Sequence, residues 1–192
     1  MSSEPDTDGQ RADQTRCTAA VLEATPDAAV VSNLGVASYV LAGVEDRERN
    51  CYLWGSMGST TATGIGVAHG TTEQVTVLAG DGSLTMSLGV LSTVATADQS
   101  NLTVVCFDNG IYGTTGGQPT PSVDFAAAAE AQGLSATSVD TNEAFAEAYT
   151  DAVERDSPSL IECAVEPTDP ESRPTFDYPH IPRRVRDSLT DT

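Results

Sequence analysis

Five short segments of this chain are almost entirely apolar, and they alternate with stretches that have helical spacing. A strand with one face in water alternates polar and apolar residues, so uninterrupted runs indicate strands buried on both faces. A sixth and more polar segment completes the expected strands, which are 28–33, 50–55, 74–80, 101–109, 135–140 and 158–166. The pattern predicts an α/β fold, a three-layer α-β-α sandwich around a mostly parallel sheet.

The stretches between these strands are expected to form helices. The clearest is 142–156, where Phe145 and Tyr149 share one apolar face with several alanines. The other expected helices are 17–25, 36–44, 59–70, 87–97 and 123–133. A chain of 192 residues is most naturally one domain. We expect a disordered acidic tail at 1–16, the folded domain at 17–166 and an irregular C-terminal tail at 167–192.

The chain has a formal charge of −19, from 28 acidic and 9 basic residues, and every basic residue is Arg. Such a charge argues against binding to nucleic acid or to an anionic membrane surface. Carboxylates in place of Lys keep a protein in solution at high salt, where screening weakens the self-repulsion. We therefore expect a halophilic, high-salt cytosol. The alternative, an ordinary acidic protein, is disfavoured because it would rarely lack Lys altogether.

No apolar run approaches about 18 residues, so no membrane-spanning helix is expected. The first 16 residues are polar and acidic, which does not fit a signal peptide, and a cytoplasmic location is expected. The four cysteines show no Cys-x-x-Cys spacing; they are Cys17, Cys51, Cys106 and Cys163. We expect buried free thiols rather than disulfides or a metal site.

Three polar, glycine-rich turns follow expected strands, at 54–58, 80–83 and 108–113. Ligands of parallel α/β sheets bind at the carboxyl ends of the strands, so these turns are expected to gather around a ligand. Asp81 offers a carboxylate between two glycines, and Asn109 offers an amide oxygen in a second turn; 25 residues (83–107) separate the triplets 80–82 and 108–110.

Such oxygens, with the carbonyl two residues after Asn109, could bind Mg²⁺ together with diphosphate oxygens and water. The amides of the segment after Asp81 could receive phosphate oxygens. Asp-Gly and Asn-Gly are also ordinary turn dipeptides, and either one alone would favour that simpler interpretation.

The paired turns resemble the thiamine diphosphate motif, which runs from Gly-Asp-Gly to Asn-Asn. The chain departs from the motif at its first Asn, which is Asp108 here. The resemblance implies that Asp81 and Asn109 bind Mg²⁺ through side chains and Ile111 through its carbonyl. The cofactor contacts implied at these turns are Gly80, Asp81, Gly82, Ser83, Leu84, Asn109, Ile111 and Tyr112.

The segment Trp-Gly-Ser-Met-Gly at 54–58 resembles the turn that holds the aminopyrimidine ring in decarboxylases of this superfamily. The resemblance implies that the Gly55 carbonyl accepts from the 4′-amino group and that Met57 is the apolar wedge that bends the cofactor. Ser56 and Gly58 complete this turn. The alternative for Met57 is an ordinary core position. Gly35, after the first strand, occupies the place of another diphosphate-contacting loop.

Residues 28–165 resemble the beta subunits of sulfopyruvate decarboxylases and the corresponding half of phosphonopyruvate decarboxylases. In that family a glutamate from a separate pyrimidine-binding domain activates the cofactor, and only residues 1–27 precede the first expected strand here. Glu45 and Glu48 lie in a charged segment that is more typical of a solvated loop. The resemblance therefore implies an alpha subunit that supplies the glutamate, and a hetero-oligomer.

The implied reaction is the decarboxylation of 3-sulfopyruvate to sulfoacetaldehyde and CO₂. The alternatives are a phosphonopyruvate or other 2-oxo-acid decarboxylase subunit, or a thiamine diphosphate-binding module without catalysis. The dispersed cysteines disfavour a ferredoxin-linked oxidoreductase.

Four polar residues in or just after the predicted metal-binding turn at 108–113 could face the substrate or could only shape the loop. They are Tyr112, Thr114, Thr115 and Gln118. No Arg occurs between positions 50 and 154. A cationic clamp for an anionic substrate would therefore come from the partner or from the tail residues Arg173, Arg183, Arg184 and Arg186. His69 and His180 are expected to be structural.

Overall fold

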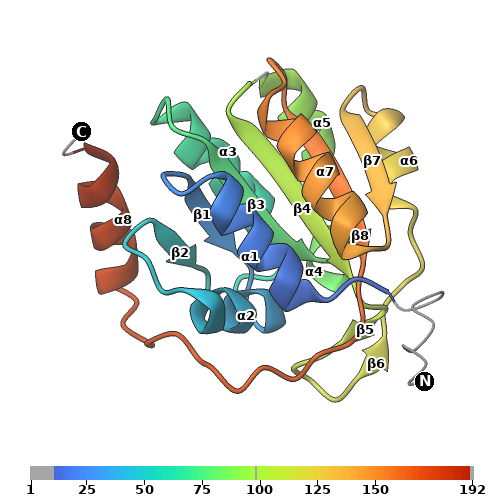
Figure 1. Cartoon of the computed structure of the whole chain (residues 1–192), viewed down its shortest axis with the longest axis horizontal. Coiled ribbons are helices and arrows are strands. Elements are labelled where there is room, and N and C mark those ends of the chain that lie inside the picture. The colour runs from blue at the N-terminus through green and yellow to red at the C-terminus, as the bar shows by residue number, and fades with distance from the viewer. Residues whose placement is uncertain (1–10, 98, 191–192) are drawn as a thin grey trace, which may run out of the picture.

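The computed structural model describes residues 11–97 and 99–190. A six-stranded sheet in the order β2-β1-β3-β4-β8-β7 forms the centre, and all of its strand pairs are parallel (Figure 1). The strands are β1 (Ala29–Ser32), β2 (Asn50–Tyr52), β3 (Val75–Gly80), β4 (Leu102–Asp108), β7 (Ser135–Val139) and β8 (Ser159–Ala164). The predicted α/β fold is confirmed, and all six expected strands are present.

Helices cover both faces of the sheet. On one face α1 packs against both α2 and α7, and on the other α3 contacts α5 (Figure 1). The helices are α1 (Gln14–Ala24), α2 (Val36–Val44), α3 (Thr60–His69), α4 (Asp81–Thr85), α5 (Val90–Ala97), α6 (Phe125–Glu130), α7 (Asn142–Val153) and α8 (His180–Thr190). None of the helices among the described residues is long and apolar enough to cross a membrane.

The central strands β3 and β4 are buried along nearly their whole length, as their uninterrupted apolar runs predict. The small residues of α3 allow that helix to lie close to the sheet, because a Cβ at Gly64 would collide with Cγ2 of Val77. All four cysteines are buried and free, as predicted. Burial raises the pKa of the Cys106 thiol well above its usual value, which keeps the thiol neutral.

Two elements near the carboxyl edge of the sheet, where the ligand is expected, differ from the sequence interpretation. The chain becomes helical at Asp81, directly after β3, and the expected helix at 87–97 is shorter and begins at Val90. The segment after β4 forms an antiparallel hairpin of β5 (Ile111–Tyr112) and β6 (Gln118–Pro119), which was not predicted. Strands of two residues are too short for a sequence period to reveal them.

The expectation of a disordered tail at 1–16 was wrong for its last residues, while residues 1–10 lie outside the described part. Ala12 forms a parallel bridge with Val165. Asp13 caps α1, because its side chain accepts from the backbone N–H groups of Thr15 and Arg16. The folded domain therefore begins earlier than position 17.

The expectation of an irregular tail at 167–192 was wrong for α8. The segment 167–179 has no helix or strand, and we call it the arm. α8 then packs beside β2, with Ile181 and Val185 buried and Arg184 donating to Asp46 (2.7 Å) and to the Asn50 carbonyl (3.1 Å). The sequence did not predict this helix because Ile181 and Val185 stand among arginines and a proline, so too few apolar residues showed a helical period.

Candidate cofactor and metal site

The three predicted turns meet at the carboxyl edge of the sheet, where β1, β3 and β4 lie side by side. They surround a cavity of about 90 Å³. Of the predicted site residues, those that line the cavity are Met57, Gly80, Asp81, Gly82, Ser83, Ile111, Tyr112, Thr114 and Thr115. The three turns, which lie far apart in the sequence, therefore meet at one cavity, as expected from their positions after the strands.

Asn33, which the sequence interpretation did not include, connects the end of β1 to the turn at Gly80. The Gly80 N–H donates to Asn33 Oδ1 (2.7 Å), and the Asn33 N–H donates to the Leu78 carbonyl (2.9 Å). A polar residue at the end of an apolar strand, two positions before Gly35, was the signal that could have identified it. Gly35 has φ of 93°, and a Cβ there would lie 3.0 Å from Cγ2 of Thr114, so this turn requires glycine.

Asp81 is nearly buried at 3% exposure. Its Oδ2 accepts from the Thr120 hydroxyl (2.6 Å), a residue the sequence interpretation missed. Burial raises the pKa of the Asp81 carboxyl, and the nearby Asp108 carboxylate raises it further, while hydrogen bonds from Thr120 and the Gly82 N–H act in the opposite direction. Two neighbouring carboxylates at one sheet edge favour a bound cation.

The side chain of Asn109, predicted to bind Mg²⁺, forms a hydrogen bond within its own turn in the structure. Its Oδ1 accepts from the Ile111 N–H (3.0 Å), within a turn in which Gly110 has φ of 72°. Asn109 is not among the residues that line the cavity, whereas Ile111 is. The amide oxygen has a second lone pair, so this bond leaves it able to accept or coordinate once more. Its role as a metal ligand stays a prediction.

The donor set of this edge fits Mg²⁺ with a diphosphate. It combines the Asp81 carboxylate with amide and carbonyl oxygens, which are the hard ligands that Mg²⁺ prefers. In the described ranges 11–97 and 99–190 no group of three or more His, Cys, Asp or Glu side chains could hold a metal.

The loop of residues 54–58 is tied to the same edge. The Gly58 N–H donates to Ser83 Oγ (3.0 Å), and both Gly55 and Gly58 have positive φ, at 67° and 85°. Met57 is half-buried and lines the cavity, while Ser56 is exposed. The structure thus brings Met57 to the cavity of Asp81, and its role as an apolar wedge stays a prediction.

The β5–β6 hairpin covers the opposite side of the cavity. The ring of Tyr112 lies against Gly82, where a Cβ would collide with it. Gln118 is exposed, and its Nε2 donates to the Thr115 carbonyl (2.9 Å) across the hairpin. A substrate contact for Gln118 stays a prediction, since its observed bond shapes the loop.

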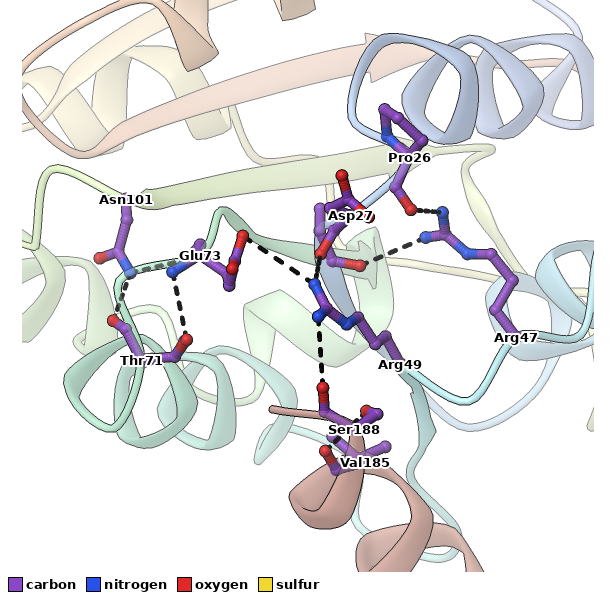
Figure 2. Close-up of polar contacts among 10 residues, drawn as sticks. Pro26, Asp27, Arg47, Arg49, Thr71, Glu73, Asn101, Val185 and Ser188 are labelled. Atoms are coloured by element: carbon purple, nitrogen blue, oxygen red, sulfur yellow. Dashed lines mark hydrogen bonds and ion pairs between the residues drawn. The ribbon is translucent and has the colours of Figure 1, made fainter. Parts of the chain in front are cut away.

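A larger cavity of about 910 Å³ lies at the amino edge of the sheet, where Arg47, Arg49, Arg183 and Arg184 line it. Figure 2 shows Arg47 donating to Pro26, and Arg49 reaching Asp27, Glu73 and Ser188. These guanidinium groups mostly donate to backbone carbonyls, so they hold the entry of β1 and the end of α8 in place.

Of the four tail arginines, Arg183 and Arg184 therefore lie at the amino edge of the sheet, away from the candidate site at the carboxyl edge, and cannot clamp a substrate there. Arg173 lies on the arm at the carboxyl edge. It lines a cavity of about 220 Å³ together with Val36, Gly113 and Thr114, which also line the cavity of Asp81.

The fold and this edge define a class: α/β proteins that bind a cofactor at the carboxyl ends of parallel strands. A family model described as "Thiamine pyrophosphate enzyme, C-terminal TPP binding domain" matches residues 32–163. The chain belongs to this family, and the predicted resemblance is confirmed.

Relatives with curated names are decarboxylases. The phosphonopyruvate decarboxylase of Streptomyces viridochromogenes is 39% identical over 169 residues, which are 85% of this chain and 43% of that protein. The sulfopyruvate decarboxylase subunit beta of Methanocaldococcus jannaschii is 36% identical over 135 residues, which are 69% of this chain and 72% of that subunit. The chain thus spans less than half the length of the phosphonopyruvate decarboxylases that it matches.

Among solved structures, the thiamine diphosphate-dependent 4-hydroxybenzoylformate decarboxylase of Rhodococcus jostii RHA1 superposes with a TM-score of 0.75. It is 26% identical, and the match covers 85% of this chain and 34% of that one.

Proposed function

We propose that this chain is the beta subunit of a thiamine diphosphate-dependent 2-oxo-acid decarboxylase, with 3-sulfopyruvate as its preferred substrate. The observation that carries the proposal is the convergence of three glycine-rich turns around the buried Asp81. The similarity to named sulfopyruvate decarboxylase beta subunits supports the substrate.

In this proposal Mg²⁺ is held by the Asp81 and Asn109 side chains and the Ile111 carbonyl. The bound thiamine diphosphate supplies the electron sink for loss of CO₂. The Gly55 carbonyl would orient the aminopyrimidine, Met57 would support the cofactor as an apolar wedge, and Thr114 would face the substrate side. The residues that line the diphosphate are Gly35, Gly80, Gly82, Ser83, Leu84 and Tyr112.

The proposal includes an alpha subunit that supplies the catalytic glutamate. Glu45 and Glu48 are exposed in their charged loop. Glu162 is the one buried glutamate in the described part of the chain, and its Oε2 accepts from the Ala126 N–H at the start of α6 (3.0 Å). It is therefore already engaged, which supports a partner as the source of the acid. The name "subunit beta" of several relatives supports the same conclusion.

A phosphonopyruvate decarboxylase is the second candidate, because the relative from Streptomyces viridochromogenes is similar over 85% of this chain. Sulfonate and phosphonate are both anionic and tetrahedral, so the recognition chemistry is shared. A cofactor-binding module without catalysis is the third candidate.

Co-expression with a candidate alpha subunit from the same genome tests these proposals. We expect a complex that releases CO₂ from sulfopyruvate faster than from phosphonopyruvate or pyruvate, in concentrated salt. Preference for phosphonopyruvate would favour the second candidate. Thiamine diphosphate binding without CO₂ release from any of the three acids would favour the binding module and contradict the decarboxylase.

A further inference from the structure

The cavity of about 910 Å³ at the amino edge of the sheet has no part in the proposed function. We call it the arginine cavity, because Arg47, Arg49, Arg183 and Arg184 line it. These are four of the nine basic residues of a chain whose net charge is −19. Protein cavities that hold small molecules have volumes of about 300–1,000 Å³. The arginine cavity therefore has the size of a ligand site and a local concentration of positive charge.

Three segments that are far apart in the sequence build the arginine cavity. They are the entry of β1 at 26–27, the loop before β2 at 47–49, and α8. Figure 2 shows where they meet: Arg49 donates to the Asp27 carbonyl and, through Nη2, to the Ser188 carbonyl (3.2 Å). A ligand in the cavity would therefore contact all three segments at once.

The carbonyl groups at this edge do not by themselves require positive charge. In the same view, the neutral amide of Asn101 donates to the carbonyls of Thr71 and Glu73 (3.0 and 2.9 Å), which precede β3 (Figure 2). One uncharged side chain is enough there, whereas the entry of β1 has both Arg47 and Arg49. Satisfying backbone acceptors therefore accounts for donors at this place, but not for two guanidinium charges.

Most of these charges also lack a close counter-ion. Arg184 pairs with Asp46 at 2.7 Å, but the carboxylate of Glu73 is 3.9 Å from Arg49. Within residues 11–97 and 99–190, Arg47 and Arg183 form no ion pair. Burial lowers the pKa of Arg47, as expected where a charge leaves water without a close partner. An anionic group in the cavity would supply the missing counter-charge.

Carboxylates also line the cavity; they are Asp27, Glu48, Asp177 and Asp187. Two of them are engaged, since Asp187 pairs with its neighbour in α8 (2.6 Å) and Asp177 Oδ1 accepts from the N–H of His180 (3.1 Å). In the described part of the chain Asp27 and Glu48 form no ion pair. They are free to accept from hydroxyl or amino groups of a ligand.

We propose that the arginine cavity is a ligand site for a small molecule that carries two or more phosphate groups. Guanidinium groups bind phosphate oxygens through paired N–H donors. Arg183 is the most accessible of the four, because it is exposed and only its Nε is engaged, by the Pro179 carbonyl (2.8 Å). A net charge of −19 repels anions from most of the surface, so a cavity rich in arginine is where one can bind. The proposal does not depend on decarboxylase activity.

Calorimetry on the purified full-length chain tests the proposal, with ATP and inorganic triphosphate as probes in KCl with EDTA. We expect at least one probe to bind with a dissociation constant below about 1 mM. Arg183→Gln and Arg47→Gln should each weaken binding by about tenfold or more, because each removes charged donors. Tighter binding of ATP would support an organic phosphate as the ligand, and tighter binding of triphosphate an inorganic one.

Arg155→Gln is the matched control, because Arg155 is an exposed arginine just after α7 that does not line the cavity. We expect it to bind the probes as the wild type does. Circular dichroism melting verifies that the variants are folded, and Arg183→Gln keeps the test decisive if Arg47→Gln is not. No binding of either probe to the wild type, or wild-type affinity in folded Arg183→Gln and Arg47→Gln, would overturn the proposal.

A phosphate-bearing probe could also enter the candidate cofactor cavity, and Asp81→Asn separates the two places. We expect Asp81→Asn to bind ATP and triphosphate with wild-type affinity in EDTA. Affinity that falls in Asp81→Asn but not in Arg183→Gln would place the probes at the carboxyl edge and overturn the proposal. None of these outcomes depends on release of CO₂, so they are independent of the proposed function.

Backbone hydrogen exchange gives a second readout. Because the cavity lies between α8 and two loops, a bound ligand should hold α8 in place and slow the exchange of its amides. We expect slower exchange in α8 at saturating ATP and unchanged exchange in α7. Exchange in α8 that stays the same at saturating ATP would overturn the proposal.

Discussion

At the scale of single residues, one buried carboxylate lies where the turns after β1, β3 and β4 meet. Asp81 is fixed by Thr120 and faces the like charge of Asp108. A buried carboxylate beside a second, partly buried one is unfavourable without a counter-charge. This arrangement supports the proposed Mg²⁺ at the edge.

Asp81→Asn keeps the shape of the side chain and removes its charge. Loss of residues that only support a metal ligand costs about 10- to 100-fold in affinity, so loss of this ligand is expected to weaken Mg²⁺-dependent cofactor binding by more than about 100-fold. Calorimetry on the assembled complex measures it, with Asp151→Asn on the exposed face of α7 as the control. Binding of the cofactor at wild-type affinity would remove Asp81 from the metal site.

At the scale of elements, α8 covers the edge strand β2, which would otherwise present unpaired backbone groups. Arg184 connects the two, through Asp46 and the Asn50 carbonyl. Burial raises the pKa of Asp46, but hydrogen bonds from Arg184 and Tyr52 and the charge of Arg184 outweigh it, so the pKa is lowered. The ionised form of Asp46 therefore stabilises the docked helix.

Asp46→Asn is expected to lower the free energy of unfolding by at most about 1 kcal/mol near neutral pH, because the pair is partly exposed. Since the pKa of Asp46 is lowered in the folded state, its contribution is present above the ordinary value of 3.8 and is lost as the pH falls below it. Urea denaturation at about pH 7 and about pH 3 measures the difference between wild type and variant.

Asp187→Asn is the control for that comparison, because within the described residues the only ion pair of Asp187 is with its exposed neighbour Arg186. An equal effect of Asp46→Asn at both pH values would show that the ionised carboxylate does not hold α8.

At the scale of the whole molecule, 28 acidic residues against 9 basic ones mean that negative side chains repel one another across the protein and lower its stability. Salt screens exposed charges over about 10 Å at 0.1 M and over about 3 Å at 1 M, so stability is expected to rise with KCl. The replacement of three exposed glutamates by glutamine lowers the repulsion without touching the core; these are Glu130, Glu147 and Glu154.

Thermal unfolding against KCl concentration measures this effect. The melting temperature of the wild type should rise steadily with salt, and that of the triple variant should rise less steeply. The same slope for both proteins would mean that the salt acts through apolar burial rather than through charge screening.

The sequence by itself determined the repeating order of strands and helices, because the period of apolar residues is a local property. It also identified Asp81, Met57 and Ile111 as neighbours, since parallel strands bring the turns at their carboxyl ends to one edge. The buried state of Cys51, Cys106 and Cys163 followed from their apolar surroundings in the same way.

Only the tertiary structure decided which side chains complete that edge. Asn33 and Thr120 reach the Gly80–Asp81 turn because β1 pairs with β3 and because the β5–β6 hairpin folds back, and both depend on long-range pairing. The helix α8 also depends on packing rather than on local spacing. Local periodicity specifies the elements, whereas contacts between distant segments specify how the side chains between them meet.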